Sequence, residues 1–228
     1  MKSYFWDHYI HPLKELHYFF SYPIINLIIA RNKSSAPVVS KDVIVIVECW
    51  FQSNSYHALW KNYLEKKGFK IYLLTFTDMN ESFENTAKKL HSKIQKLEIE
   101  NFTLVGISTG AIVCLEYLNS YDTWGRIKRF ISVAGPLHGT KAGWLISFTR
   151  KGRDIVPESK YIQKLSSKPV DVGKMVTLSA LHDEFVPLKS SIWKGVPSHV
   201  IKVYGHNFFH LDHKETYDLI AELSRQST

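Results

Sequence analysis

The sequence predicts an α/β protein whose central sheet is mostly parallel and carries helices on both faces. From about residue 42 onward, short apolar and β-branched runs alternate with segments of helical length. That alternation is typical of a parallel sheet whose strands are joined by helices. The first run, residues 42–48 (DVIVIVE), is nearly all β-branched, as a strand buried on both faces requires.

The remaining elements follow in chain order. A helix over 56–67 is expected to end at Gly68, and the next strand covers 69–76. Over 82–98, the apolar residues recur at the spacing of an amphipathic helix. Further strands are expected over 102–107, 127–134, 175–181 and 200–204, and further helices over 111–118 and 215–223. Active sites in such sheets lie at the carboxyl ends of the strands.

The 228 residues divide into an aromatic-rich N-terminal extension, 1–36, and one domain, 37–228. Within the extension, apolar residues of 12–30 recur at helical spacing around a break or kink at Pro23. One interpretation is an extra helix packed across the core. The other is a segment on an anionic membrane surface, where its tyrosines and Trp6 suit the headgroup zone.

The charge pattern argues against nucleic acid as a partner. Lys and Arg total 29 and Asp and Glu 21, a net charge of +8, but no nucleic-acid motif is present. We interpret the basic residues as solvated side chains. They include Lys88, Lys89, Lys93 and Lys96 on a helix, and Arg150, Lys151 and Arg153 in a loop.

Two cysteines, Cys49 and Cys114, are too few for a disulfide framework, and each lies among apolar neighbours. We expect both to be buried free thiols, which suits a reducing compartment. No secretory signal and no apolar run long enough to span a bilayer is recognisable. The predicted location is therefore the cytoplasm, with membrane association as the alternative that the N-terminal segment raises.

A Gly-x-Ser-x-Gly motif at 106–110 lies where the strand 102–107 ends and a helix begins. A nucleophile elbow needs that context, because Gly106 and Gly110 have no side chain to collide when the chain reverses at Ser108. The helix that follows would direct the positive end of its dipole at the serine. We interpret Ser108 as a nucleophile. The alternative is a glycine-rich turn in which Ser108 is merely polar.

From about residue 42 to 224 the chain resembles the lipase and esterase branch of the α/β-hydrolase superfamily, in particular the small bacterial lipases without a large lid. Residues 133–143 (VAGPLHGTKAG) are similar to the Pro-His-x-Gly-Ser/Thr stretch that follows the strand after the elbow in many lipases. Residues 155–165 (IVPESKYIQKL) are similar to a Pro-x-Ser-x-Phe/Tyr-Leu segment found shortly after it. The resemblance implies the α/β-hydrolase fold with a small or absent lid.

In this fold the nucleophile is followed by an Asp or Glu and then by a His. Residues 181–187 (LHDEFVP) follow a predicted strand and resemble the acid loop of the family, so Asp183 is the preferred acid. Glu184 is the second choice and Asp171 the third.

The base is expected directly after the last strand. The resemblance favours a Gly-His pair there, which makes His206 the preferred base. His210, within a His-Leu-Asp sequence, and His213 are the alternatives. His206 and His210 also have a metal-ligand spacing, but no third ligand is evident, so neither a metal nor another cofactor is expected.

The pattern of the family breaks where the first strand ends. There the family usually continues into His-Gly and a further residue whose backbone N–H helps to bind an oxyanion, but this chain has Glu48 and Cys49. The oxyanion donors that we assign are the backbone N–H groups of Trp50 and Thr109. A missing glycine restricts the backbone at the first donor.

These observations predict a monomeric, serine-dependent carboxylic ester hydrolase that acts on a small acyl ester or a lipid. The alternative, motivated by Glu48 and Cys49, is a catalytically weak or inactive hydrolase-like protein that binds an acyl ligand or a protein partner. Four large apolar residues could build an acyl pocket, or belong to the core as such residues usually do. They are Trp144, Leu145, Phe148 and Trp193.

Overall fold

The computed structural model describes residues 42–49 and 57–226 of the chain. The N-terminal extension 1–36 and the oxyanion donor Trp50 lie outside the described residues, so both remain predictions. The division of the chain at residue 36 likewise remains a prediction.

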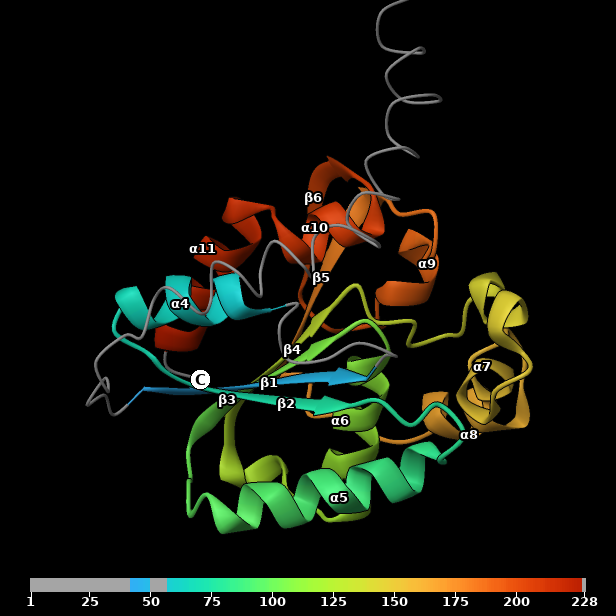
Figure 1. Ribbon diagram of the computed structural model, residues 1–228, viewed down its shortest axis with the longest axis horizontal. Coiled ribbons are helices and arrows are strands. Elements are labelled where there is room, and N and C mark those ends of the chain that lie inside the picture. Colours follow the sequence, from blue (N-terminus) through green and yellow to red (C-terminus); the bar gives the residue numbers. More distant parts are fainter. Residues whose placement is uncertain (1–41, 50–56, 227–228) are drawn as a thin grey trace, which may run out of the picture.

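The described residues form a six-stranded sheet in the order β2-β1-β3-β4-β5-β6, in which every neighbouring pair is parallel (Figure 1). Its strands are β1 (Val43–Cys49), β2 (Lys70–Phe76), β3 (Phe102–Ile107), β4 (Ile127–Val133), β5 (Met175–His182) and β6 (Ser198–Tyr204). The predicted class, an α/β fold with a mostly parallel sheet, is confirmed. The strand bounds differ from the predicted ones by at most two residues at either end.

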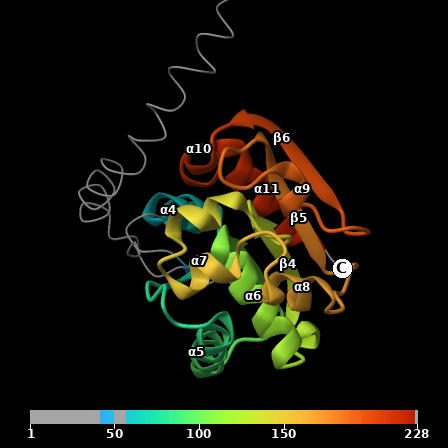
Figure 2. The ribbon, with the colours of Figure 1, turned by 90° about the vertical axis from the view of Figure 1, so that its right-hand side faces the viewer.

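Both faces of the sheet are covered by helices. On β1, Val45 and Val47 pack into one core, while Ile44 and Ile46 pack into the other. The bounds of the helices are α4 (Ala58–Lys66), α5 (Phe83–Lys96), α6 (Thr109–Ser120), α7 (Arg150–Asp154), α8 (Lys160–Ser166), α9 (Leu188–Ser191), α10 (His206–Leu211) and α11 (Lys214–Arg225), with 3-10 turns η2 (Trp124–Arg126) and η3 (Lys141–Ile146). Helices α5, α6 and α8 contribute to the first core, and α4, α10 and α11 to the second (Figures 1 and 2).

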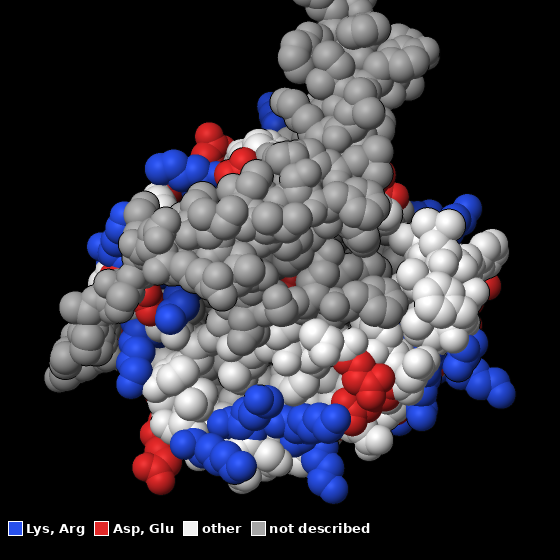
Figure 3. All heavy atoms as spheres, in the orientation of Figure 1, with Lys and Arg blue, Asp and Glu red and all other residues white. Residues whose placement is uncertain are grey.

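Helix α5 shows how the sequence fixes these elements. Ser82 caps it by accepting a hydrogen bond from the backbone N–H of Asn85 at 3.1 Å. Its apolar stripe, Phe83, Ala87, Leu90 and Ile94, is buried as the spacing predicts. The opposite face carries exposed lysines, which gather over α5 in Figure 3. The prediction that the lysines of this helix are solvated is confirmed.

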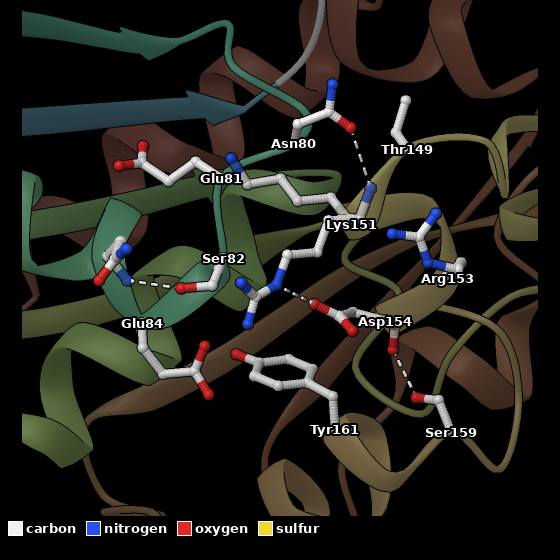
Figure 4. Close-up of polar contacts among 12 residues, drawn as sticks. Asn80, Glu81, Ser82, Glu84, Thr149, Lys151, Arg153, Asp154, Ser159 and Tyr161 are labelled. Carbon is white, nitrogen blue, oxygen red and sulfur yellow. Dashed lines mark hydrogen bonds and ion pairs between the residues drawn. The ribbon is translucent and has the colours of Figure 1, made fainter.

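Between β4 and β5 the chain builds η3, α7 and α8, where the length of the sequence leaves room for one or two helices without fixing their positions. The expectation that Lys151 is a solvated loop residue is wrong, because its side chain is fully buried in α7. Its Nζ donates to the Asp78 carbonyl oxygen at 2.5 Å, and the side chain points toward the 78–81 loop (Figure 4). Beside it, Asn80 Oδ1 accepts the backbone N–H of Arg150 at 3.3 Å. These contacts tie the segment to the loop that follows β2.

Both cysteines are buried and free, as predicted. Burial raises the pKa of the Cys49 thiol to about 11, which keeps it protonated at neutral pH. Of the helices that the structure describes, none has the length and apolar character to cross a membrane.

Candidate active site

Ser108 occupies a sharp turn between β3 and α6. Its φ of 50° and ψ of −124° are unusual for a residue other than glycine, and such backbone strain is concentrated at functional sites. Glycine is required on both sides of the turn. A Cβ on Gly106 would lie 2.5 Å from Ala111 Cα, and one on Gly110 would lie 2.2 Å from the Val47 carbonyl oxygen. The turn therefore depends on the close approach of α6 to both β3 and β1.

His206 and Asp183 meet Ser108 at the carboxyl edge of the sheet. His206 begins α10 directly after β6 and Gly205, which takes a φ of 97°. Its Nε2 lies 3.1 Å from Ser108 Oγ and its Nδ1 lies 2.7 Å from Asp183 Oδ2. With Nδ1 protonated, the imidazole donates to the carboxylate and can accept the hydroxyl proton of the serine. Three residues that are far apart in the sequence thus form one hydrogen-bonded row.

The carboxylate of Asp183 is held in place by its own loop. Its Oδ1 accepts the backbone N–H groups of Phe185 at 2.9 Å and Val186 at 2.7 Å, which leaves Oδ2 facing His206. Glu184, the second choice for the acid, instead accepts the backbone N–H of His206 at 3.2 and 3.3 Å. A carboxylate at the first residue of α10 also suits the helix dipole.

The remaining candidates for the acid and the base occupy different positions. Asp171 accepts backbone N–H groups in a turn before β5, at the amino edge of the sheet. The His213 ring hydrogen-bonds a threonine hydroxyl in the first turn of α11. His210 lies one turn after His206, with its ring centroid 4.7 Å from that of His206. Of the candidate bases, His206 is the one whose ring meets the Ser108 hydroxyl.

Thr109 begins α6, where the backbone N–H groups of the first turn have no intrahelical acceptor. Its amide therefore stands at the positive end of the helix dipole, next to Ser108. The Thr109 hydroxyl donates to the carbonyl oxygen of Cys49, the last residue of β1. This hydrogen bond ties the elbow to the strand end that precedes Trp50. Nothing in the sequence pattern signals it.

Comparisons with solved structures concern the fold as a whole. The chain superposes on the mature form of a lipase of Bacillus licheniformis with a TM-score of 0.64, at 15% identity, covering 84% of this chain and 95% of that one. For the carboxylesterase CesB of Bacillus subtilis the TM-score is 0.60, at 11% identity, with coverages of 92% and 97%. For the phospholipase PlaB of Legionella pneumophila it is 0.67, at 10% identity, with coverages of 82% and 59%.

The chain has the α/β-hydrolase fold. Among its structural neighbours are bacterial esterases and lipases, which confirms the predicted resemblance at the level of the fold. No protein-family model matches the sequence, and no curated protein is similar enough in sequence to serve as a relative. At these identities the neighbours identify the fold, and the roles of individual residues rest on the geometry of this chain.

The two stretches that resemble lipase segments pack against each other. The Thr140 backbone N–H donates to the Ile155 carbonyl at 2.7 Å, and Gly139, with a φ of 80°, lies against Pro157. His138 Nε2 lies 3.1 Å from the carbonyl oxygen of residue 192, and burial lowers the pKa of His138. These contacts hold the loop after β4 onto the segment that leads to β6.

At the end of β1, where the sequence departs from the pattern of the lipases that it resembles, a buried carboxylate meets a buried histidine ring. The Glu48 carboxylate lies 3.0 Å from Nδ1 of His57, and both side chains are buried. Sequence reasoning missed His57, although a buried carboxylate requires a partner. Among the described residues, no group of three His, Cys, Asp or Glu side chains is arranged to hold a metal ion.

Three of the four residues considered for an acyl pocket are exposed rather than buried. Trp144, Leu145 and Phe148 are 64%, 76% and 74% exposed, so the expectation that they belong to the core is wrong. Trp193 is buried and stacks on His138, with centroids 5.1 Å apart. The exposed three belong to the segment around η3 and α7, which lies over the carboxyl edge of the sheet in Figures 1 and 2.

Proposed function

We propose that the chain is a serine-dependent carboxylic ester hydrolase in which Ser108, His206 and Asp183 act as a triad. The observation that carries the proposal is the His206 ring, which lies within hydrogen-bond distance of Ser108 Oγ at 3.1 Å and of Asp183 Oδ2 at 2.7 Å. A serine hydroxyl is a weak nucleophile unless an adjacent base takes its proton, and the base must in turn be oriented.

In the proposed reaction, Ser108 Oγ attacks the acyl carbonyl carbon while His206 Nε2 takes the hydroxyl proton. His206 then gives that proton to the leaving alkoxide, and an acyl-enzyme remains on Ser108. His206 takes a proton from a water molecule, which attacks the acyl carbon; the bond to Ser108 Oγ breaks, the acid is released, and His206 returns the proton to Ser108 Oγ. Asp183 stays ionised and stabilises the imidazolium in both halves.

The negative charge on the carbonyl oxygen needs donors that are in place before the reaction. We assign this role to the backbone N–H of Thr109 and to that of Trp50, which follows the strand end to which the Thr109 hydroxyl is bonded. One such donor is worth about 10²–10³ in rate. The Thr109–Cys49 hydrogen bond would stiffen a strand end that lacks the glycine of the family.

The test is hydrolysis of p-nitrophenyl esters of increasing acyl length by the full chain. Ser108→Ala should lower kcat by about 10⁶, and His206→Ala by a similar factor. His213→Ala is the matched control for a histidine of the same segment and should stay within about twofold of wild type. Turnover by Ser108→Ala within tenfold of wild type would remove Ser108 from the mechanism. Absence of turnover by the wild-type chain on every ester would favour the inactive, ligand-binding alternative.

We further propose that the substrate is an acyl ester or lipid met at an anionic membrane surface. The exposed side chains of Trp144, Leu145 and Phe148 are accompanied by the exposed cations Lys141, Arg150 and Arg153. Apolar side chains at the headgroup level with cations beside them suit an anionic leaflet.

Co-sedimentation with vesicles of anionic lipid tests the membrane proposal without requiring activity. The full chain should pellet with the vesicles at low salt, less so at high salt, and replacement of the three apolar residues by serine should abolish the effect. The same assay on a chain lacking residues 1–36 tests the predicted contribution of the N-terminal segment. Equal pelleting of the wild type and the triple variant would show that these three side chains do not bind the membrane.

A further inference from the structure

Behind the candidate triad, three histidine rings stand in a row inside the protein. The ring centroids of His206 and His210 lie 4.7 Å apart in an edge-on contact, and those of His210 and His57 lie 5.7 Å apart in a stacked one. The Glu48 carboxylate ends the row, 3.0 Å from His57 Nδ1. Exposed fractions are 0% for His57, 5% for Glu48 and 6% for His210.

The row connects three elements of the fold: β1, the start of α4, and α10. Glu48 lies on β1 next to its last residue, Cys49, and His57 lies at the N-terminus of α4. His206 and His210 are separated by one turn of α10. Because Glu48 accepts a hydrogen bond from His57 Nδ1, it fixes the plane of that ring, and the stacked contact fixes His210 in turn.

Some ring nitrogens of the row make no hydrogen bond to the residues that the structure describes. His57 Nε2 and His210 Nδ1 are buried and have no hydrogen-bond partner among the described residues. What links His210 to His206 is therefore the contact between their rings, rather than these nitrogen atoms.

Resting on the proposed function, we propose that His210 is a positioning residue for the base: it holds the ring plane of His206, and Glu48 holds His210 through His57. In the reaction His206 becomes positively charged. A neutral His210 beside it does not repel this charge and so does not oppose proton transfer to His206. Burial, followed by the proximity of His206 and His57, lowers the pKa of His210 well below 6.5.

The groups around His210 are consistent with this assignment. Its titratable neighbours are His206 and His57, and the charges behind those two rings are Asp183 and Glu48. The Trp60 ring, edge-on to His57 at a centroid distance of 5.4 Å, closes the far side.

The experiment compares His210→Ala, His210→Phe and the control His213→Ala in the full chain. His210→Ala should lower kcat for ester hydrolysis about tenfold, which is about 1.4 kcal/mol in the barrier, with KM within about twofold. His210→Phe restores a ring of similar shape and should return kcat to within about threefold of wild type. A kcat of His210→Ala equal to that of His213→Ala, or a His210→Phe variant as slow as His210→Ala, would overturn the proposal.

Coupling to Glu48 is tested by a double-mutant cycle. If Glu48 acts through His57 and His210, then Glu48→Gln lowers kcat on its own but adds nothing to His210→Ala. Additive losses would remove Glu48 from the row. Thermal unfolding of each variant identifies losses that come from a damaged fold.

A spectroscopic readout separates this inference from the proposed function. The His206 Nδ1–H proton bonded to Asp183 should give a low-field NMR resonance in wild type, His210→Phe and His213→Ala, and a broadened or lost one in His210→Ala. This signal needs no turnover. If Ser108→Ala is as active as wild type, the proposed function fails. If Ser108→Ala is inactive and the resonance is unaltered in His210→Ala, the positioning role fails.

Discussion

Replacing Gly110 by alanine introduces a methyl group where α6 lies directly against the backbone of β1. The new Cβ would lie 2.2 Å from the carbonyl oxygen of Val47 and 2.9 Å from its carbonyl carbon, whereas ordinary contact begins at 3.4 Å. Both atoms belong to the backbone of a buried central strand, which cannot turn aside as a side chain could. Helix α6 must therefore withdraw from β1 by about 1 Å.

Such overpacking costs about 3 kcal/mol, the upper end of the usual range, because backbone rather than side chain must yield. Activity should fall further than stability, since Ser108 and Thr109 move with the start of α6. A displacement of about 1 Å at reacting groups can cost about 10² in rate. Gly125→Ala is the matched control, because nothing lies within 4 Å of a Cβ at that position.

The assay is urea unfolding together with kcat/KM for a p-nitrophenyl ester, for both variants and the wild type. We expect Gly125→Ala to keep both quantities close to wild type. A Gly110→Ala variant with unchanged stability and activity would refute the claim that the elbow depends on this contact.

Four further outcomes are expected. Asp183→Asn should lower kcat by about 10⁴ without unfolding the protein, because the amide favours the wrong histidine tautomer, as circular dichroism and kinetics together would show. Thr109→Val should lower the free energy of unfolding by about 1–3 kcal/mol and lower kcat, because the carbonyl at the end of β1 loses its donor, whereas Thr109→Ser should keep both. Burial raises the pKa of Glu116, but its hydrogen bonds, above all the one from Lys168, lower that pKa by more, so that it lies below 4.5. Lys168→Ala should therefore lower the free energy of unfolding by about 3 kcal/mol at pH 7, as measured in urea. The loss should become smaller as acid protonates the Glu116 carboxyl. Because burial keeps His210 neutral in the folded chain, the unfolded chain binds a proton below about pH 6.5 that the folded chain does not. The free energy of unfolding should therefore be unaffected by His210 above about pH 6.5 and fall by up to about 1.4 kcal/mol per pH unit below it. Unfolding curves between pH 8 and 5 should show a smaller slope for His210→Phe.

The sheet could be predicted from the sequence because its signals are local. A strand buried on both faces reads as a β-branched run, and β3, at Phe102–Ile107, has the predicted bounds. The proposed triad residues could be chosen from the sequence because each lies within two residues of the carboxyl end of a strand. Ser108, Asp183 and His206 all meet this condition.

Features that depend on long-range contacts could not be predicted in this way. From the sequence, Lys151 is expected at the surface, because nothing local indicates that the Asp78 carbonyl oxygen accepts a hydrogen bond from it. The pairing of Glu48 with His57 joins a strand end to a helix start, and no periodicity signals it. Hydrophobicity alone would place Trp144 in the core, because large apolar residues are usually buried, but its side chain is exposed.

The central claim is that Ser108 carries a hydroxyl activated by His206. Labelling with a fluorophosphonate probe, followed by mass spectrometry of the adduct, tests it most directly, because only an activated serine reacts. The wild-type chain and His213→Ala should carry one adduct at Ser108, His206→Ala should react far more slowly, and Ser108→Ala should not react. An adduct on another serine, or ester turnover by a chain whose Ser108 stays unlabelled, would contradict the account.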